Sequence, residues 1–515
     1  MPASPSSRPE EPLATPLTDL VAWLGARCVG DPSATVVTGL TLSSQRVRPG
    51  DLYAALPGAS RHGAAFADDA VAAGAVAVLT DAAGCEQLGP TGVPVLVLED
   101  LRPVLGALAA RVYGEPAAAL TLMAVTGTQG KTTTTRLLEA GLELAGIPAA
   151  VVGTVGTRIA GHDVRTALTT PEAPDLHALF AVMREHDVVG CAMEVSSHAL
   201  VMGRVDGVVF DVAAFANLGR DHLDFHADME EYFAAKASLF TPEHARLGLT
   251  NVDDEHGRRL LEVAGIPMRT FSPSGADADW RAVDVELAPE GSRFTVIAPD
   301  GARIAAGVPL TGAFNVANAL CAVALAAEAG FDPVVVAAGI AASHGVPGRL
   351  ERIDGGQDFL VVVDYAHKPD ALEAAVAAVR PLTTGKLVVV IGAGGDRDTG
   401  KRPLMGEIGA RLADVLVVTD DNPRSEDPTA IRRAVLDGAD QVPSADRAEV
   451  LELGDRREAI RRAIASAGPG DTVLIAGKGH ETGQEVGVGP DKVVHPFDDR
   501  DEARAALAAL GEAGR

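Results

Sequence analysis

The amino-acid sequence predicts an α/β protein of several domains, on three observations. Short runs rich in Val, Ile and Leu alternate with Ala-rich stretches of helical length, which is typical of parallel sheets covered by helices. A chain of 515 residues is also too long for a single hydrophobic core. Aromatic residues make up only 4% of the chain, which favours closely packed α/β layers over a β-sandwich.

A short leader and three blocks divide the chain. Residues 1–16 are rich in Pro, Ser and Glu and contain no apolar segment, so we expect a disordered leader there and not a signal peptide. The alternation of strand and helix runs then predicts three domains, at residues 17–119, 120–345 and 346–515.

Six apolar runs are the strand candidates within these blocks. Those of the third block are continuously apolar, as expected of strands that are covered on both faces. The candidates are residues 75–79, 95–98, 120–125, 359–363, 387–391 and 415–418.

Charge and cysteine content exclude several classes of protein. The net charge of −26 would repel nucleic acid and anionic membranes over most of the surface, so an anionic substrate needs a local basic pocket. No apolar stretch reaches the length of a membrane span. The cysteines are too widely spaced for a disulfide framework or a zinc site, which predicts buried thiols in a cytoplasmic protein. They are Cys28, Cys85, Cys191 and Cys321.

A glycine-rich loop follows the apolar run that opens the second block. The strand Thr121–Val125 leads into Thr126-Gly-Thr-Gln-Gly-Lys131-Thr132 and then into a helical stretch, Thr133–Ala145. This order wraps backbone N–H groups around phosphates, with Lys131 neutralising the β- and γ-phosphates and Thr132 offering its hydroxyl to Mg²⁺. The general pattern has a Gly where Val125 stands, so a turn with an incidental lysine is the alternative.

The loop alone leaves a GTPase, a kinase, a motor and a ligase open, although no NKxD or TKxD guanine-reading motif occurs. Further polar segments follow at Glu194–Leu200, Asn217–His226 and Tyr232–Phe240. Carboxylate and imidazole groups beside a phosphate loop suggest further metal coordination. Taken alone, His222 and His226 could be a zinc pair or solvated polar residues.

Ten motifs in order carry a family resemblance. They are GTQGKT, EVSSHAL, DHLDFH, YFAAKASLF, TGAFNVANA, VPGRLE, DYAHKPD, GGDRDTGKRP, DNPR and GKGHE. This series resembles the Mur ligases, and within them the members that add diaminopimelate to a peptidoglycan precursor. It extends over residues 40–481. The resemblance implies three α/β domains: an N-terminal UDP-binding domain, a central P-loop ATPase and a C-terminal Rossmann-like domain that binds the amino acid.

The resemblance also implies a reaction. The γ-phosphate of ATP passes to the D-Glu side-chain carboxylate of UDP-N-acetylmuramoyl-L-Ala-D-Glu, and the amine of diaminopimelate attacks the resulting acyl phosphate. All reactants are anionic, so catalysis is mainly charge neutralisation and alignment. The implied catalytic residues are Lys131, Glu194, His222 and Lys236.

Two magnesium sites and a modified lysine are implied as well. Thr132 and Glu194 would hold one Mg²⁺ and His222 a second. Lys236 corresponds to a lysine that CO₂ converts to a carbamate, which can ligate Mg²⁺ where an ammonium cannot. An ordinary lysine on a helix surface is the alternative for Lys236.

The implied nucleotide and precursor contacts lie in all three blocks. Asn318 would read adenine, and Arg349 and Asp364 would touch ATP when the domains close. The P-loop contacts are Gly127, Thr128, Gln129, Gly130, Lys131, Thr132 and Thr133. The precursor contacts are Leu42, Ser44, Ala59, Ser60, Arg61, Thr169, Thr170, Ser196, Met202 and Arg204. The chain departs from the family pattern at Gln45 and Gln129, where Arg and Asn are usual, and at Met202, where some members carry Gln.

The third block supplies the implied diaminopimelate pocket. Arg424 of the DNPR motif would bind, through a bidentate pair of hydrogen bonds, the distal carboxylate that lysine lacks. The remaining contacts are Arg397, Asp421, Asn422, Pro423, Gly477 and Glu481. Locally, DNPR could be a plain Asx-Pro turn, and the segment Gly392–Arg397 is a partial dinucleotide fingerprint that fails at Arg397.

Other functions remain as alternatives. A lysine-adding homologue and a folylpolyglutamate-type ligase are the enzyme alternatives, and a non-catalytic nucleotide switch is the third. We expect a monomer with small-molecule substrates and with neither nucleic-acid nor membrane partners.

Overall fold

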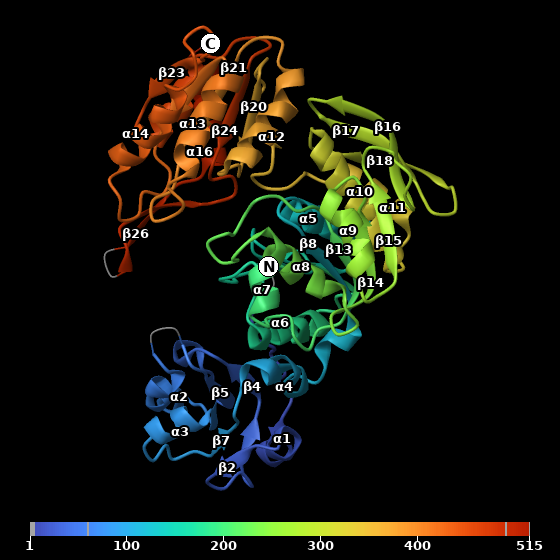
Figure 1. The fold of residues 1–515 in the computed structure, drawn as a ribbon, viewed down its shortest axis with the longest axis vertical. Helices are drawn as coiled ribbons and strands as arrows, with labels where there is room; N and C mark the ends of the chain where they lie inside the picture. The colour runs from blue at the N-terminus through green and yellow to red at the C-terminus, as the bar shows by residue number, and fades with distance from the viewer. Residues whose placement is uncertain (1–5, 59–60, 490–491, 514–515) are drawn as a thin grey trace. The chain divides into compact units, whose positions relative to one another are not determined.

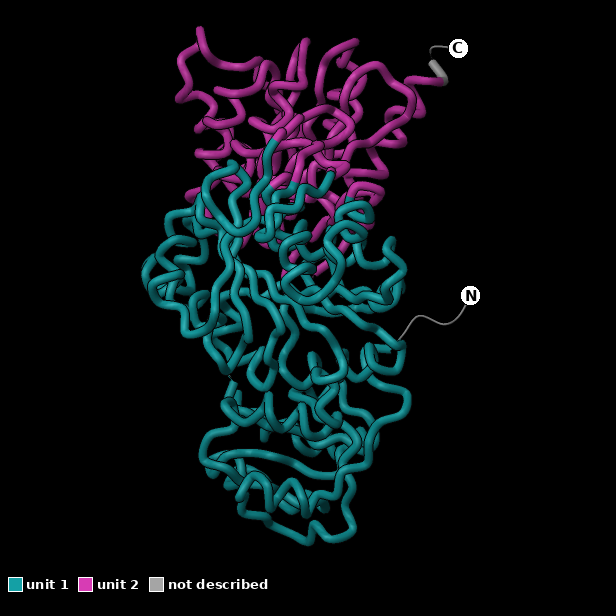
Figure 2. The backbone as a smooth tube through the Cα atoms, turned by 90° about the vertical axis from the view of Figure 1, so that its right-hand side faces the viewer, with its two compact units in different colours: residues 1–283, 296–305, 317–340 teal, residues 284–295, 306–316, 341–515 magenta. Residues whose placement is uncertain are grey.

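The computed structural model describes residues 6–58, 61–489 and 492–513. The predicted precursor contacts Ala59 and Ser60 lie outside the described residues. The chain forms two compact units, drawn in different colours in Figure 2. Unit 1 comprises residues 1–283, 296–305 and 317–340, and unit 2 comprises residues 284–295, 306–316 and 341–515.

A five-stranded sheet opens unit 1. Its strands, in order across the sheet, are β2 (Arg27–Val29), β7 (Val95–Val97), β6 (Ala77–Thr80), β5 (Asp51–Ala55) and β4 (Gly39–Thr41). The neighbours pair in parallel except β2 and β7. The predicted strands 75–79 and 95–98 correspond to β6 and β7. The helices here are α1 (Leu17–Leu24), α2 (Ala67–Ala72), α3 (Ala82–Gln87) and α4 (Leu105–Val112).

The described part of the predicted leader is ordered, so the expectation of disorder is wrong for residues 6–16. The strand β1 (Thr15–Pro16) pairs with β3 (Val36–Val37). Arg8 is buried, and its guanidinium lies 3.3 Å from the Asp51 carboxylate and donates to the Tyr113 hydroxyl at 2.6 Å. The composition suggested a segment with too little apolar surface to order, but this buried ion pair holds it.

The second sheet contains eleven strands, and its central members pair in parallel. In order these are β11 (His162–Val164), β10 (Thr157–Ile159), β9 (Ala149–Val152), β12 (Gly190–Glu194), β8 (Thr121–Thr126), β13 (Phe210–Phe215), β14 (Ala245–Asn251), β15 (Met268–Ser272), β16 (Trp280–Ala288), β17 (Gly291–Ile297) and β18 (Arg303–Val308). β8, the predicted strand 120–125, lies between β12 and β13.

Helices cover this central sheet (Figure 1). They are α5 (Lys131–Leu144), α6 (Ala173–Glu185), α7 (Ser197–Val201), α8 (Met229–Ala237), α9 (Glu255–Val263), α10 (Ala313–Glu328) and α11 (Pro333–Ala342). α5 begins two residues before the predicted helix at Thr133. Gly130, with φ +85°, turns the chain so that Lys131 already lies in the first helical turn.

A six-stranded sheet forms the core of unit 2, with order β19 (Glu351–Arg352), β20 (Leu360–Asp364), β24 (Thr472–Ala476), β21 (Leu387–Ile391), β22 (Val415–Val418) and β23 (Glu449–Glu452). All pairs except β19–β20 are parallel. The predicted strands 387–391 and 415–418 match β21 and β22, and 359–363 is one residue from β20.

Both faces of this sheet are covered, as its apolar strands predicted. The helices α12 (Pro369–Val379), α13 (Lys401–Leu412) and α14 (Pro428–Ala439) pack on the face that contains Val389. The helices α15 (Arg456–Ala465) and α16 (Asp499–Ala513) pack on the face that contains Val388. A hairpin of β25 (Gly483–Val486) and β26 (Val493–Pro496) follows β24.

The prediction of buried thiols is right for two of the four cysteines, Cys191 and Cys321. All four cysteines are free, and burial raises the pKa of Cys191 and Cys321 to about 12. Cys28 and Cys85 are only partly buried, because they lie on the edge strand β2 and on the short surface helix α3. Among the helices of the described residues, none is long and apolar enough to cross a membrane.

Candidate active site

The phosphate loop lies between β8 and α5 and is tied to the neighbouring strand. Asn217, which follows β13, accepts the backbone N–H of Thr128 at 3.2 Å and that of Gln129 at 2.9 Å. Its side-chain amide also donates to the Gln129 carbonyl at 3.2 Å. These bonds fix both ends of the Asn217 amide. Sequence reasoning gave Asn217 no role, although a polar residue directly after an apolar strand was the available signal.

Two lysines contact the same loop carbonyl. Lys131 Nζ donates to the Gly127 carbonyl at 2.7 Å and to the Thr128 carbonyl at 3.1 Å. Lys236 Nζ, from α8, donates to the Gly127 carbonyl at 2.9 Å and lies 4.5 Å from the centre of the Tyr232 ring. Lys236 is buried, so the alternative of an ordinary surface lysine is wrong.

Glu194 connects the phosphate loop to the turn that contains Thr169 and Thr170. Its carboxylate accepts the hydroxyl of Thr132 at 3.0 Å and the backbone N–H of Thr154 at 2.7 Å. The Thr154 hydroxyl lies 3.1 Å from the same carboxylate and 3.0 Å from the Thr169 hydroxyl. Thr170 donates to the Glu194 carbonyl at 2.8 Å. The bonded series therefore runs from Thr132 through Glu194 and Thr154 to Thr169.

A glycine permits this arrangement. A Cβ atom on Gly153 would lie 2.3 Å from Glu194 Oε1, so only glycine fits beside the carboxylate. Thr154, the next residue, was not predicted. The order of strands β9, β12 and β8 brings it to Glu194, and that order cannot be read from the sequence.

The predicted muramoyl-peptide contacts gather beside Glu194. Arg204 donates to the Glu172 carboxylate at 2.9 Å and approaches the Met202 sulfur at 3.3 Å. The backbone N–H of Ser196 donates to the Thr170 hydroxyl at 3.3 Å. Glu172, which sequence reasoning missed, also accepts Arg102 at 2.7 Å and so links the group to the first block of the chain.

The uridine-side residues lie on two turns of the five-stranded-sheet domain. Ser44 begins a 3₁₀ turn, Ser44–Arg46, that follows the partly buried Leu42. Arg46 of this turn pairs with Asp175 of α6 at 2.9 Å. Arg61 is exposed in the second turn, where its carbonyl accepts the Gly58 N–H at 3.1 Å.

His222 and His226 have different environments. His222 has a left-handed φ of +53°, and its ring lies 3.3 Å from the Asp221 carboxylate and packs edge-on against His198. His226 is buried and contacts the Ser197 hydroxyl at 2.9 Å. Within the described ranges, no group of three or more His, Cys, Asp or Glu side chains could hold a metal ion.

The remaining nucleotide residues divide between the units. Asn318, in unit 1, accepts the Thr134 hydroxyl at 3.4 Å, and a Cβ on Gly130 would lie 2.4 Å from its side-chain oxygen. In unit 2, the Asp364 carboxylate accepts the backbone N–H of Leu350 at 2.7 Å. Burial raises the pKa of Asp364, and the nearby Arg349 opposes this shift without cancelling it. Arg349 lies over the Tyr365 ring, 4.4 Å from its centre.

The DNPR turn and the GKGHE turn meet at the carboxyl ends of β22 and β24. Asn422 donates to the Glu481 carboxylate at 2.9 Å, and a Cβ on Gly477 would lie 3.2 Å from the Asp421 carboxylate. Pro423 is buried between them and the loop after β21. Arg397 lies exposed in that loop. The structure thus gathers the predicted pocket residues with Arg397 at the margin.

Arg424 is held by residues that sequence reasoning did not identify. Its Nε donates to the Glu485 carboxylate at 3.0 Å and a terminal nitrogen donates to the Gly395 carbonyl at 2.7 Å. Its backbone has a left-handed φ of +50° and donates to the Glu485 carbonyl at 3.1 Å. The hairpin β25–β26 therefore fixes both the backbone and the side chain of Arg424.

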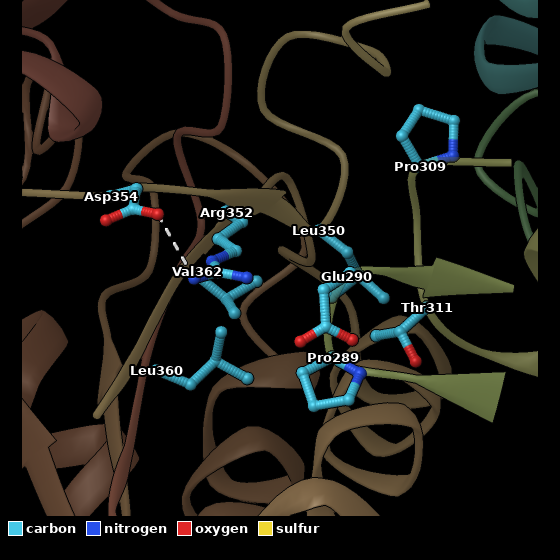
Figure 3. Close-up of a pocket in the computed structure, with 9 residues that line it drawn as sticks. All are labelled: Pro289, Glu290, Pro309, Thr311, Leu350, Arg352, Asp354, Leu360 and Val362. Atoms are coloured by element: carbon cyan, nitrogen blue, oxygen red, sulfur yellow. Dashed lines mark hydrogen bonds and ion pairs between the residues drawn. The ribbon is translucent and has the colours of Figure 1, made fainter. Parts of the chain in front are cut away.

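A cavity elsewhere in unit 2 contains none of the predicted residues. It has a volume of about 200 Å³, and Figure 3 shows Glu290, Thr311 and Arg352 on its wall. Arg352 donates to the Asp354 carboxylate at 3.1 Å.

Three family models match successive parts of the chain. They are the Mur ligase family, catalytic domain, at residues 36–113, the Mur ligase middle domain at residues 125–326, and the Mur ligase, glutamate ligase domain at residues 348–479. The chain belongs to the Mur ligase family. The predicted three-domain α/β architecture of that family is confirmed.

Individual Mur ligases match over nearly the whole chain. A UDP-N-acetylmuramoyl-L-alanyl-D-glutamate–2,6-diaminopimelate ligase of Streptomyces avermitilis is 55% identical over 97% of this chain and 98% of its own length. The ligase of the same description from Corynebacterium efficiens is 51% identical over 97% and 95%. A solved structure of a ligase so described is 32% identical, with a TM-score of 0.66 over 94% of this chain and 97% of its own.

Proposed function

We propose that this Mur ligase adds diaminopimelate to the D-Glu side-chain carboxylate of UDP-N-acetylmuramoyl-L-Ala-D-Glu, with ATP converted to ADP and phosphate. The relatives at 51–55% identity that share this description support the assignment. The observation that carries it is the bonded series from Thr132 to Thr169, because it joins the ATP-binding loop to the turn expected to hold the precursor.

The reaction requires a carboxylate to become a good electrophile beside a phosphate donor. Lys131 neutralises charge on the ATP phosphates, while Arg204 and the threonine hydroxyls at 169 and 170 orient the precursor. The carboxylate attacks the γ-phosphorus, the bond from that phosphorus to the bridging oxygen breaks, and ADP leaves. The amine then attacks the acyl carbon, loses a proton and expels inorganic phosphate. Arg349 and Asp364 belong to the expected ATP contacts on closure.

Two groups would assist this chemistry. Thr132 and Glu194 offer oxygen ligands within 3.0 Å of each other, the kind that Mg²⁺ takes together with phosphate oxygens, and His222 is the expected ligand of a second ion. Mg²⁺ supplies charge neutralisation between the phosphates. The buried Lys236 is the residue proposed to carry CO₂ as a carbamate. Its position beside the P-loop carbonyl of Gly127 fits a role next to the nucleotide.

Selection of the amino acid is assigned to unit 2. A carboxylate on the distal end of diaminopimelate suits the Arg424 guanidinium, whereas lysine would leave that cation without its partner. The lysine-adding alternative therefore depends on Arg424 having no such role. A cytoplasmic location remains the expectation for an enzyme of this substrate class.

An acceptor panel tests the proposal. ADP release is measured with the UDP-linked dipeptide and ATP, in the presence of meso-diaminopimelate, LL-diaminopimelate, lysine or no amino acid. We expect release to require the dipeptide together with a diaminopimelate isomer. Lysine-dependent release of equal efficiency would refute the acceptor assignment. ADP release that does not depend on the amino acid would support the alternative of a nucleotide switch.

A further inference from the structure

A fully buried lysine lies at the centre of the proposed amino-acid pocket. Lys478 Nζ donates to Asp421 at 3.2 Å, to the Asn422 side-chain oxygen at 2.9 Å and to Glu481 at 3.1 Å. An ammonium has three N–H donors, so these three acceptors use all of them. Each acceptor is a residue that we assign to the pocket.

The fold brings this lysine across the sheet. Lys478 follows β24, and Asp421 and Asn422 follow β22, with β21 between the two strands. Left-handed glycines flank the lysine, with φ +124° at Gly477 and +55° at Gly479. The turn they form carries the lysine whose side chain reaches the DNPR segment. Lys478 thus adds a side-chain link beside the backbone hydrogen bonds that join Arg424 to Glu485 and Gly487.

The ammonium also sets which way the Asn422 amide faces. Its side-chain oxygen accepts both Lys478 Nζ and the backbone N–H of Glu485, at 2.9 and 3.0 Å. Its nitrogen is therefore on the opposite side, where it donates to Glu481 at 2.9 Å. One N–H of this amide is used on Glu481, and the second is a donor, which matches a carboxylate and not an ammonium.

The carboxylates bonded to Lys478 outnumber the ammonium. Two carboxylates, Asp421 and Glu481, face one ammonium, which leaves one negative charge. Asp421 is buried, which by itself raises its pKa, but Lys478 and Arg456 more than offset this effect and the pKa is lowered. Arg456 is itself paired with the buried Asp499 at 2.7 Å. One net negative charge suits a ligand end that carries an ammonium. Removal of Lys478 would leave two negative charges, on Asp421 and Glu481.

We propose that Lys478 is a positioning residue for amino-acid selection: it orients Asn422 and limits the cluster of Asp421, Glu481 and Lys478 to one net negative charge, so that an acceptor with both a distal ammonium and a distal carboxylate is favoured. This inference rests on the proposed function. Without Lys478, the extra negative charge would repel the distal carboxylate of diaminopimelate, whereas lysine has no such group. Lys478→Met should therefore lower kcat/KM for diaminopimelate more than kcat/KM for lysine.

The test compares kcat/KM for meso-diaminopimelate and for lysine in wild type, Lys478→Met and Lys478→Gln. We expect the ratio of the two constants to fall at least about tenfold in Lys478→Met, mainly through KM for diaminopimelate, with KM for ATP unchanged. In Lys478→Gln, which keeps amide donors at this position, the ratio should fall less. This variant tests the inference if the methionine variant does not fold. Arg500→Met is the matched control, because it removes a largely buried cation whose 2.9 Å partner, Asp498, lies outside the pocket.

The Arg500→Met control should lower Tm and keep the ratio. An unchanged ratio in Lys478→Met and Lys478→Gln, or equal losses for both amino acids, would overturn the inference and leave Lys478 a structural residue. A wild-type enzyme that shows no diaminopimelate-dependent ADP release would instead refute the proposed function, so the two failures are distinguishable.

Discussion

Lys131 and Lys236 donate hydrogen bonds to one oxygen, the carbonyl of Gly127, at 2.7 and 2.9 Å. Two ammonium groups on one acceptor repel each other. Conversion of Lys236 to a carbamate would replace this repulsion with an attraction to Lys131. The relationship ties both proposed catalytic lysines to the phosphate loop and makes their roles separable by experiment.

Lys131→Ala should lower kcat by roughly 100-fold or more, because it removes the charge that neutralises the phosphates. The fold should persist, since the side chain is only partly buried and donates to carbonyls of its own loop. ADP release and Tm are the measurements. Lys386→Ala, at an exposed position of unit 2, is the control and should match wild type. Retention of most activity in Lys131→Ala would contradict the P-loop assignment.

Lys236→Ala should lose activity that millimolar acetate or formate partly restores, because a small carboxylate can occupy the place of the carbamate. Wild-type activity should fall when CO₂ is removed from the buffer. Lys131→Ala is the matched control, because a missing cation is not replaced by an added anion. Full activity of Lys236→Ala without any additive would exclude the carbamate.

Acid should weaken unit 1 through His177. Burial lowers the pKa of this histidine to about 4, below its ordinary value of 6.5. The unfolded chain therefore takes up the proton first as pH falls, and stability is lost between about pH 6.5 and 4. The loss amounts to about 3 kcal/mol at most. In thermal unfolding at pH 7 and pH 5, His177→Leu should lose less stability on acidification than wild type. Equal losses would mean that His177 does not titrate with unfolding.

The sequence motifs predicted the candidate site residues, but not the residues that hold them in place. Lys131, Glu194 and Arg424 were predicted because each lies in a contiguous motif. Asn217, Thr154, Glu172 and Glu485 were not, because each reaches its partner only through the order of strands or the path of a hairpin.

The prediction of disorder in the N-terminal segment was wrong for a related reason. Its composition describes the isolated chain, whereas Arg8 is ordered by Asp51 and Tyr113, which lie far along the sequence. Burial also decided between the two readings of Lys236. The sequence left an ordinary surface lysine as the alternative, and the burial of Lys236 against the Gly127 carbonyl contradicts that alternative.

Arg424 gives the most direct test of the central claim that this enzyme selects diaminopimelate. Loss of a bidentate Arg–carboxylate pair in a closed pocket costs about 2–5 kcal/mol, or tens to thousands in rate. Arg424→Ala should therefore raise KM for diaminopimelate steeply and hardly change KM for ATP or the UDP-precursor.

The decisive quantity is the ratio of kcat/KM for diaminopimelate to kcat/KM for lysine, in wild type and in Arg424→Ala. Glu485→Gln, which removes the charge that holds the guanidinium at 3.0 Å, should lower the ratio by a smaller factor. We expect a large fall in Arg424→Ala, caused by weaker use of diaminopimelate. An unchanged ratio would show that Arg424 does not recognise the distal carboxylate, and would contradict the assignment of diaminopimelate on physical grounds.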